Sequence, residues 1–401
     1  MSQVIESPPD VLGPEHVWRR SFQPLMIAVG FALGMTAPIE LLFAKRLGVG
    51  ALGIGVFLIC SAAGVLTVDV FGTRVIPRLD PRTALVAGTS MFGVSEIVLC
   101  ASNSLPLLLV GRVTQGFGGA VLGGATLQAA VRVQQRNRER ALGSVQSSLL
   151  LGSALGAPTG GYISTLLPDL TGFRLAFGAC ALMSIIVAVT VRLCLPSMPT
   201  SDQVEFGLPR FGGAPAIAPA LALGVLGHFL RSGVETTALP LVGDARGLTT
   251  ATIGLAIGVL AAVQIITLRI AGRLFERLSP TRCMGSALTL GIAAAGVLAF
   301  VPGRPAFLVV ALLFGVVNAV AMLAPPLVIM ALSTDAATGL ASYRIACGVG
   351  SVIGATSVNA ALAAAGVAAA LSGVSAVLVG GVALTYAVGR RLTPAPDRPA
   401  N

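Results

Sequence analysis

Charged residues are scarce in this sequence: Asp, Glu, Lys and Arg make up only 10% of the 401 residues, whereas 55% are hydrophobic. Ordinary soluble domains carry about 25% charged residues. Lysine is almost absent, with Lys45 as the only example, so the formal net charge of +10 comes nearly entirely from arginine. A chain with so little polar surface cannot cover a soluble fold, and we predict that most of its surface lies in lipid.

Several missing motifs exclude whole classes of function. There is no Gly-x-x-x-x-Gly-Lys-[Ser/Thr] loop, so ATP is not the expected energy source. The only two histidines, His16 and His228, are far apart in the sequence, and no metal cluster or nucleophile–base pair is visible. We therefore expect no enzyme activity, no metal and no cofactor. The six cysteines form no Cys-x-x-Cys pair, which indicates packing residues instead of a disulfide framework or a zinc site.

Long apolar runs are abundant. A helix that crosses a bilayer needs about 20 mostly apolar residues. Twelve candidate spans meet this length, near residues 22–44, 50–71, 83–102, 106–130, 141–165, 175–194, 215–239, 251–271, 284–302, 306–331, 338–362 and 367–388. The polar stretch 195–214 is rich in Pro, Ser and Gly, which predicts a cytoplasmic linker between two halves.

The arginines predict the orientation of these spans. They lie in short loops between apolar runs, which favours a membrane protein over a nucleic-acid-binding one. If the tail 1–21 is cytoplasmic, the loops on that side hold Arg74, Arg78, Arg82, Arg132, Arg136, Arg138, Arg140, Arg273, Arg277 and Arg282. The opposite loops hold only Lys45, Arg46, Arg174, Arg246 and Arg304. Twelve spans then place the basic tail 389–401 in the cytoplasm as well, and we expect a multi-pass protein of a bacterial inner membrane.

The second half of the chain repeats the first at an offset near 199 residues. Residues 78–81 (RLDP) match residues 277–280 (RLSP), and residues 142–156 align with residues 340–354. This duplication predicts an all-α membrane protein with two pseudo-symmetric six-helix bundles, residues 22–194 and 215–388. The substrate site is expected between the bundles near the middle of the membrane, and because each chain encloses its own pathway we expect a monomer.

The segment Arg112–Ala120, RVTQGFGGA, resembles the fourth-helix motif of the major facilitator superfamily of transporters. Arg112, Gln115 and Gly116 fall on one helical stripe, where small residues allow close approach of a neighbouring helix. A cation inside a span costs about 2.5–3.5 kcal/mol on insertion scales, so Arg112 should face an interior partner or a water-filled cavity. The alternative is that Arg112 only joins two helices.

Two further motifs extend the resemblance over about residues 22–388. Gly143, Gly152, Gly156, Gly160 and Gly161 have the spacing of the fifth-helix motif of antiporters in this superfamily. Pro158 stands one position later than the family's proline, and generic helix packing is the alternative reading. The loop motif between spans two and three is represented by Arg78 and Asp80, whereas its second copy, with Gly272, Glu276 and Arg277, keeps more of the family pattern.

Intramembrane acids are candidates for proton coupling. Glu40, Asp69 and Glu96 lie in or beside the first three spans. We expect Glu40 to be the main proton carrier, with Arg112 as its counter-charge. The alternative for Glu40 is a position at the outer interface beside Lys45 and Arg46.

Polar residues of other spans are candidates for the substrate cavity. His228, Arg231 and Glu235 fall within one arc of the seventh span if it is an ordinary α-helix. They either line a cavity or form an Arg–Glu pair one turn apart. Three more cavity candidates lie on other spans: Gln115, Asn318 and Arg344. The alternatives are that Arg344 marks the cytoplasmic boundary of its span and that Asn318 joins two helices.

These features and the resemblance predict a secondary active transporter that works by alternating access, with the lipid bilayer, protons and a small-molecule substrate as partners. The fifth-span motif favours proton-coupled efflux of small amphipathic organic compounds, such as drugs or secondary metabolites. One alternative is uptake or uniport of a small metabolite such as a sugar or an organic anion. Another is a transporter-like sensor that moves no substrate.

Overall fold

The computed structural model describes residues 14–71, 79–133, 138–197, 217–333 and 336–392. For some residues within these ranges only the backbone is described, among them Asp69, Gly272 and Glu276. The described chain is helical and contains no strand. This matches the expectation of an all-α protein from its long apolar runs.

In the first half of the described chain, residues 14–197, the helices are α1 (Pro14–Thr36), α2 (Glu40–Arg46), α3 (Ala51–Phe71), α4 (Pro81–Ala101), α5 (Leu105–Val133), α6 (Arg138–Ile163) and α7 (Asp169–Cys194). In the second half, residues 217–392, they are α8 (Ala218–Leu230), η3 (Arg231–Ala238), α9 (Leu239–Ala245), α10 (Thr250–Arg277), α11 (Pro280–Phe300), α12 (Arg304–Leu332) and α13 (Ala336–Leu392). Each apolar run expected from the sequence overlaps one or more of these elements.

Nine helical stretches of the described chain are long and apolar enough to cross a membrane. One of them, Ser342–Arg390, contains two of the expected spans. The elements α6 and α8 are outside this set; α8 has only 13 residues because a π-helix follows it, and α6 is rich in Ser, Thr and Gly. The chain is therefore a multi-pass membrane protein.

Three interruptions shape the helices. A turn at residues 37–39 separates α1 from α2, so Glu40 is the first residue of α2. In the second half, η3 is a π-helix between α8 and α9. In α13, Gly366 has φ 77° and ψ −177°, a conformation that is essentially restricted to glycine, and it breaks the run of 57 residues into two helices.

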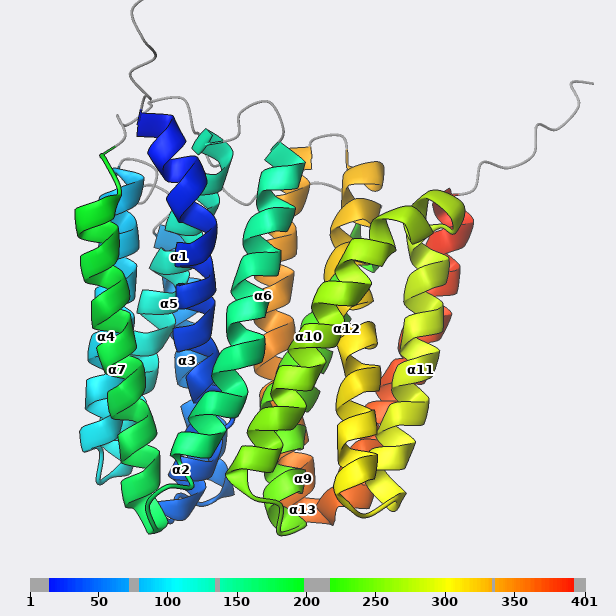
Figure 1. Ribbon diagram of the computed structural model, residues 1–401. Coiled ribbons are helices and arrows are strands. Elements are labelled where there is room, and N and C mark those ends of the chain that lie inside the picture. The colour runs from blue at the N-terminus through cyan, green and yellow to red at the C-terminus, as the bar shows by residue number, and fades with distance from the viewer. Residues whose placement is uncertain (1–13, 72–78, 134–137, 198–216, 334–335, 393–401) are drawn as a thin grey trace, which may run out of the picture.

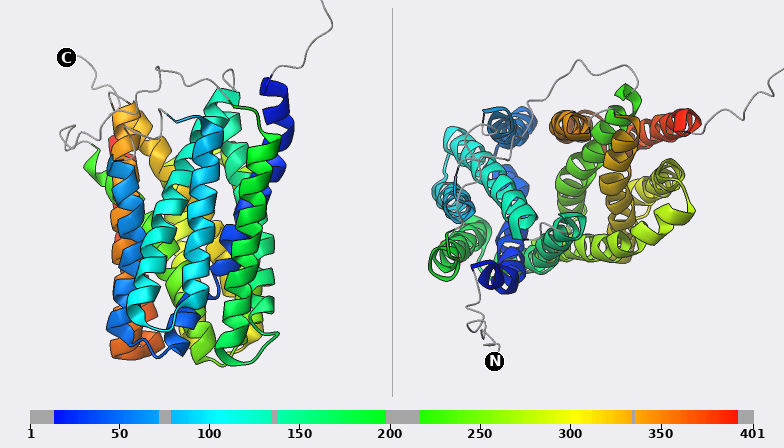
Figure 2. Two further views of the ribbon diagram at one scale, coloured as in Figure 1. Left: turned by 90° about the vertical axis from the view of Figure 1, so that its left-hand side faces the viewer. Right: turned by 90° about the horizontal axis from the view of Figure 1, so that it is seen from above.

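Figure 1 shows the helices running side by side, with both ends of the described chain at the same end of the array. The short helices α2 and α9 and the break in α13 lie at the opposite end. Within the first half α1 packs on α6 and α4 on α5 and α7; within the second, α13 packs on α8 and α11, and α10 on α12. The two halves meet where α6 packs on α10, α3 on α13 and α2 on α9 (Figures 1 and 2).

The fifth-span glycines have two different packing roles. Gly152, Gly156 and Gly160 leave no room for a β-carbon, because it would meet backbone atoms of α1. Gly161 instead faces Thr250 and Gly254 of α10, in the second half. The motif therefore brings α6 close to α1 on one side and to α10 on the other.

A cavity lined by both halves of the chain

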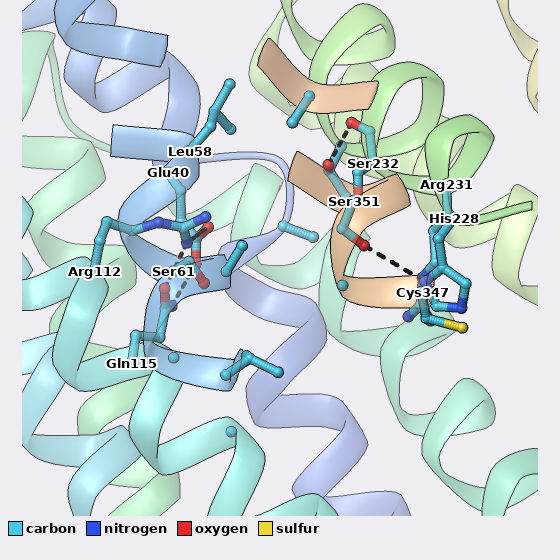
Figure 3. Close-up of a pocket in the computed structure, with 18 of the residues that line it drawn as sticks. Glu40, Leu58, Ser61, Arg112, Gln115, His228, Arg231, Ser232, Cys347 and Ser351 are labelled. Carbon is cyan, nitrogen blue, oxygen red and sulfur yellow. Dashed lines mark hydrogen bonds and ion pairs between the residues drawn. The ribbon is translucent and has the colours of Figure 1, made fainter. Parts of the chain in front are cut away.

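A cavity of about 660 Å³ lies between the two halves. Its first-half wall comes from α1 to α5 and its second-half wall from α8, η3 and α13 (Figure 3). Of the residues singled out from the sequence, Glu40, Arg112, Gln115, Gly116, His228, Arg231 and Arg344 line it. Residues from both halves thus meet around one space large enough for a small organic molecule.

The first-half wall carries a hydrogen-bonded charge network. The guanidinium of Arg112 forms an ion pair with Glu40 and also donates to the amide oxygen of Gln115. The amide nitrogen of Gln115 donates in turn to Glu40. Both charged side chains are largely covered, with exposed fractions of 12% for Arg112 and 14% for Glu40. Glu40 of α2 is therefore paired with Arg112 of α5 and does not pair with Lys45 or Arg46.

Glu96 joins this network from behind the cavity wall. Its Oε1 accepts a hydrogen bond of 2.8 Å from Nε2 of Gln115, and the residue is fully buried. Its second oxygen, Oε2, is buried and has no hydrogen-bond partner among the described residues. The amide of Gln115 therefore links two carboxyl groups, only one of which touches a cation.

Phe57 of α3 holds the other face of Arg112. The guanidinium carbon lies 4.6 Å from the centre of the Phe57 ring, within the range of a cation–π interaction. This contact fixes the guanidinium plane while its nitrogens bind Glu40 and Gln115. Gly116 allows α5 to approach α3, since a β-carbon there would meet the backbone of Ser61.

The second-half wall is richer in polar groups. His228 packs edge-on against Tyr343, with ring centres 6.3 Å apart, and its Nδ1 lies 3.5 Å from Oγ of Ser351. Arg231, Ser232 and Thr236 also line this wall. Figure 3 shows His228 and Arg231 on the opposite side of the cavity from Arg112 and Gln115.

Glu235 and Asn318 lie together, and neither is among the residues that line the cavity. Nδ2 of Asn318, on α12, donates a hydrogen bond of 2.7 Å to Oε2 of Glu235. In the part of the chain that the structure describes, Glu235 forms no ion pair with Arg231. Of the three polar residues of the seventh span, His228 and Arg231 therefore line the cavity, whereas Glu235 is bound by Asn318 of α12.

The other predicted residues whose side chains the structure describes lie away from the cavity. Asp80 is the N-cap residue of α4, and Arg277 is exposed at the end of α10. Pro158 contacts Gly258 of α10. Arg78 lies outside the described residues, and so do the side chains of Asp69 and Glu276 and the environment of Gly272.

A second ion-pair cluster joins the two halves at the end where α2 and α9 lie. Nζ of Lys45 is 2.6 Å from Oδ2 of Asp244, and Nη2 of Arg46 is 2.8 Å from Oδ1. Burial alone would raise the pKa of Asp244, but the hydrogen bonds and charges of Lys45 and Arg46 outweigh it and hold the pKa below its usual value. Asp244 is not among the residues predicted from the sequence, although it lies 199 residues after Lys45, the offset of the repeat.

Comparisons with known proteins agree with a transporter. The chain is 26% identical over 200 residues to the purine ribonucleoside efflux pump NepI of Escherichia coli O127:H6, covering 48% of this chain and 49% of the pump. It is 25% identical over 217 residues to the NepI pump of Salmonella paratyphi B, covering 51% of this chain and 53% of that pump. The chain therefore matches about half the length of these curated relatives.

Solved transporter structures share the fold. A bacterial homologue of the human lysosomal transporter Spinster superimposes with a TM-score of 0.75 at 14% identity, covering 94% of this chain and 99% of that one. A point mutant of the nucleoside transporter NupG gives 0.74 at 11% identity, with 93% and 99% covered. The model of the Major Facilitator Superfamily matches residues 24–355. This chain therefore belongs to the Major Facilitator Superfamily, whose members are transporters and not enzymes.

Proposed function

We propose that the chain exports small amphipathic organic compounds in exchange for protons, acting as a monomer. In this proposal twelve spans form two six-helix bundles, residues 22–194 and 215–388, joined by the linker 195–214. The break at Gly366 supports counting α13 as two spans. The common position of both described chain ends and the arginine-rich loops support a cytoplasmic location for both tails in a bacterial inner membrane.

The outward direction draws on two observations. The spacing of the fifth-span glycines resembles a motif of antiporters in the superfamily. One of these glycines, Gly161, packs α6 against α10 of the other half. The matched curated relatives are efflux pumps for purine ribonucleosides. A purine ribonucleoside is an amphipathic organic compound, so it is the first substrate to test.

The network of Glu40, Gln115, Glu96 and Arg112 is the observation that carries proton coupling. Gln115 connects two carboxyl groups, and the one guanidinium of the network, that of Arg112, forms an ion pair with Glu40 alone. If both acids were ionised, one negative charge would remain without a cation in a site almost closed to water, which is costly. We therefore assign one proton to the pair, with Glu40 as the group that exchanges it with the cavity because Glu40 lines the cavity and Glu96 does not.

Alternating access then connects this proton to transport. The cavity is lined by both halves, and α2 and α9 join the halves at the end away from the chain termini. Protonation of Glu40 weakens its attraction to Arg112, which belongs to α5, and so changes how α2 is held against the rest of its half. The same short helix α2 also carries Lys45 and Arg46, which pair with Asp244 of α9. In this proposal the α2–α9 contact closes that end of the cavity, and we call it the closed end.

The proposal is tested with purified protein in vesicles of known orientation. A radiolabelled purine ribonucleoside and an imposed pH gradient should give accumulation on the side of higher proton concentration, lost when a protonophore collapses the gradient. Glu40→Gln should abolish gradient-driven accumulation but keep exchange of labelled for unlabelled substrate. Asp169→Asn, which alters an exposed acid outside the network, is the matched control.

Each other outcome selects a different function. Flux that ignores the pH gradient indicates a uniporter. Accumulation in the opposite direction indicates uptake. Flux of neither the nucleoside nor other amphipathic compounds favours a sensor. Gradient-driven transport that survives Glu40→Gln but not Glu96→Gln moves the proton assignment to Glu96.

A further inference from the structure

Arg231 is a cation of the cavity wall that the charge network does not use. It is the first residue of η3 and lines the cavity. Among the residues that the structure describes, Arg231 forms no ion pair and no side-chain hydrogen bond, in contrast to Arg112, whose charge is neutralised by Glu40. An arginine inside a membrane protein normally has a partner of opposite charge, because an isolated one is costly.

The nearest acid on the same element is turned to another partner. Glu235 interacts electrostatically with Arg231, but its carboxyl group is hydrogen-bonded at 2.7 Å by Asn318 of α12. Asn318 is almost fully buried, with 2% of its surface exposed, and its Oδ1 has no hydrogen-bond partner among the described residues.

The rest of the cavity complements this cation with apolar surface. Away from the Glu40–Arg112–Gln115 network, the first-half wall is largely aliphatic and aromatic, built from Leu33, Ala37, Leu41, Leu58, Val65 and Phe92. The second-half wall adds the hydroxyl groups of Ser232, Thr236 and Ser351 around Arg231. A molecule that fills this space meets an apolar surface beside the charge network on one side, and hydroxyl groups with the positive charge of Arg231 on the other.

We propose that Arg231 binds the acidic group of the transported compound, so that the cavity prefers amphipathic monoanions with a carboxylate at Arg231 and an apolar body against α1 and α3. The planar guanidinium matches a carboxylate with two parallel hydrogen bonds. Asn318 acts as a positioning residue, since it keeps Glu235 away from Arg231. The inference rests on the proposed transport function and narrows its substrate class to anions, so a neutral purine ribonucleoside should bind less tightly than a carboxylate of similar size.

Binding is measured with two probes of the same shape and different charge, 2-naphthoate and its neutral amide, by calorimetry on the purified full-length protein. The protein should bind 2-naphthoate more tightly than the amide. Arg231→Gln should weaken naphthoate binding by roughly tenfold or more, because a hydrogen bond to a charged group is lost, and should leave amide binding nearly unchanged. Arg231→Lys should keep part of the preference for naphthoate over the amide, since lysine keeps the positive charge but cannot form the two parallel hydrogen bonds of a guanidinium.

Arg269→Gln is the matched control, because Arg269 is an exposed arginine of α10 that does not line the cavity, and it should change neither affinity. Unchanged amide binding also shows that each variant is folded.

The positioning role of Asn318 has its own test. Asn318→Leu should release Glu235 to compete for Arg231 and lower naphthoate affinity, and Glu235→Gln added to it should restore that affinity. A purely structural role of Asn318 would not be rescued by a second change at Glu235.

Equal binding of the two probes, or equal losses of both in Arg231→Gln, overturns the proposal. If transport assays show export of neutral compounds alone while naphthoate does not bind, the substrate class is wrong and the exporter function stands. If naphthoate binds at Arg231 but no compound is transported, the exporter function is wrong and the binding site stands.

Discussion

At the scale of single residues, Gln115 has the most demanding position. Its amide accepts from Arg112 and donates to two carboxyl groups, Glu40 and Glu96. No other residue type of similar size offers both a donor and an acceptor in this geometry without a charge. Glutamate at this place would bring a third acid to one guanidinium.

We therefore expect Gln115→Leu to lower the free energy of unfolding by about 1–3 kcal/mol, because the buried Glu96 loses its hydrogen-bond donor. Thermal unfolding of the purified protein in detergent measures this. The double variant Gln115→Leu/Glu96→Leu should recover part of the loss, since removal of both partners leaves no unsatisfied carboxyl. Gln23→Leu, at an exposed position of α1, is the control and should have a small effect. A double variant less stable than Gln115→Leu alone contradicts this account.

The residues of the site were partly predictable from sequence. An arginine inside an apolar run must face an interior partner, which drew attention to Arg112 and to the acids of neighbouring spans. The sequence could not show that Gln115 connects Glu40 to Glu96, because that depends on how α2, α4 and α5 pack. It also could not show that Glu235 binds Asn318 and not Arg231, because that depends on how α12 packs near η3.

At the scale of helices, the apolar runs predicted where the helices lie. The breaks between helices determine where Glu40 is placed and where the chain reverses. The run 22–44 is one candidate span in the sequence, yet the turn at residues 37–39 places Glu40 at the start of a separate helix. The runs 338–362 and 367–388 are continuous in helix except at Gly366, where a positive φ turns the chain back. Hydrophobicity fixes the length of a span but contains little information about such turns.

The break at Gly366 gives a prediction for α13. Alanine rarely adopts φ 77° with ψ −177°, so Gly366→Ala should destabilise the protein by about 1–3 kcal/mol. Gly373→Ala is the matched control: it lies in the helical part of α13 with open space around it, and alanine there should be neutral or stabilising by up to about 1 kcal/mol. Thermal unfolding of both variants in detergent checks this. Equal stabilities of the two variants would show that the chain can reverse at residue 366 without the glycine conformation.

At the scale of the whole molecule, the cavity and the α2–α9 contact are both formed where the two halves meet. Residues of both halves line the cavity, and the ion pairs of Lys45 and Arg46 with Asp244 join the halves at the end where α2 and α9 meet. The sequence repeat predicts that α2 and α9 occupy equivalent places in the two halves. It does not predict that their opposite charges meet. That contact depends on how the halves lean towards each other, a property of a conformational state that one sequence does not specify.

The pH response of this closed end follows from the sign of the Asp244 shift. Burial raises the pKa of Asp244 in the folded protein, but Lys45 and Arg46 lower it by more, so the net shift is downward. A lowered pKa stabilises the closed contact above the pKa of a free aspartate, and that contribution is lost only as pH falls through the lowered value. Asp244 therefore stays ionised across the neutral range, so in the proposed antiport the exchanged proton is placed at Glu40 and not at Asp244.

We accordingly expect Asp244→Asn to open the α2–α9 end at neutral pH, because both ion pairs across the halves are lost there. Cys347 lines the cavity and serves as the reporter, in a background where the other five cysteines are replaced. A membrane-impermeant maleimide added from the α2–α9 side should label Cys347 several-fold faster in Asp244→Asn, since each exposed ion pair contributes roughly 0.2–1 kcal/mol. Asp169→Asn, at an exposed acid of the same end, should leave the rate unchanged. Labelling that is as slow in Asp244→Asn as in the control would mean that packing of α2 on α9, and not charge, closes this end.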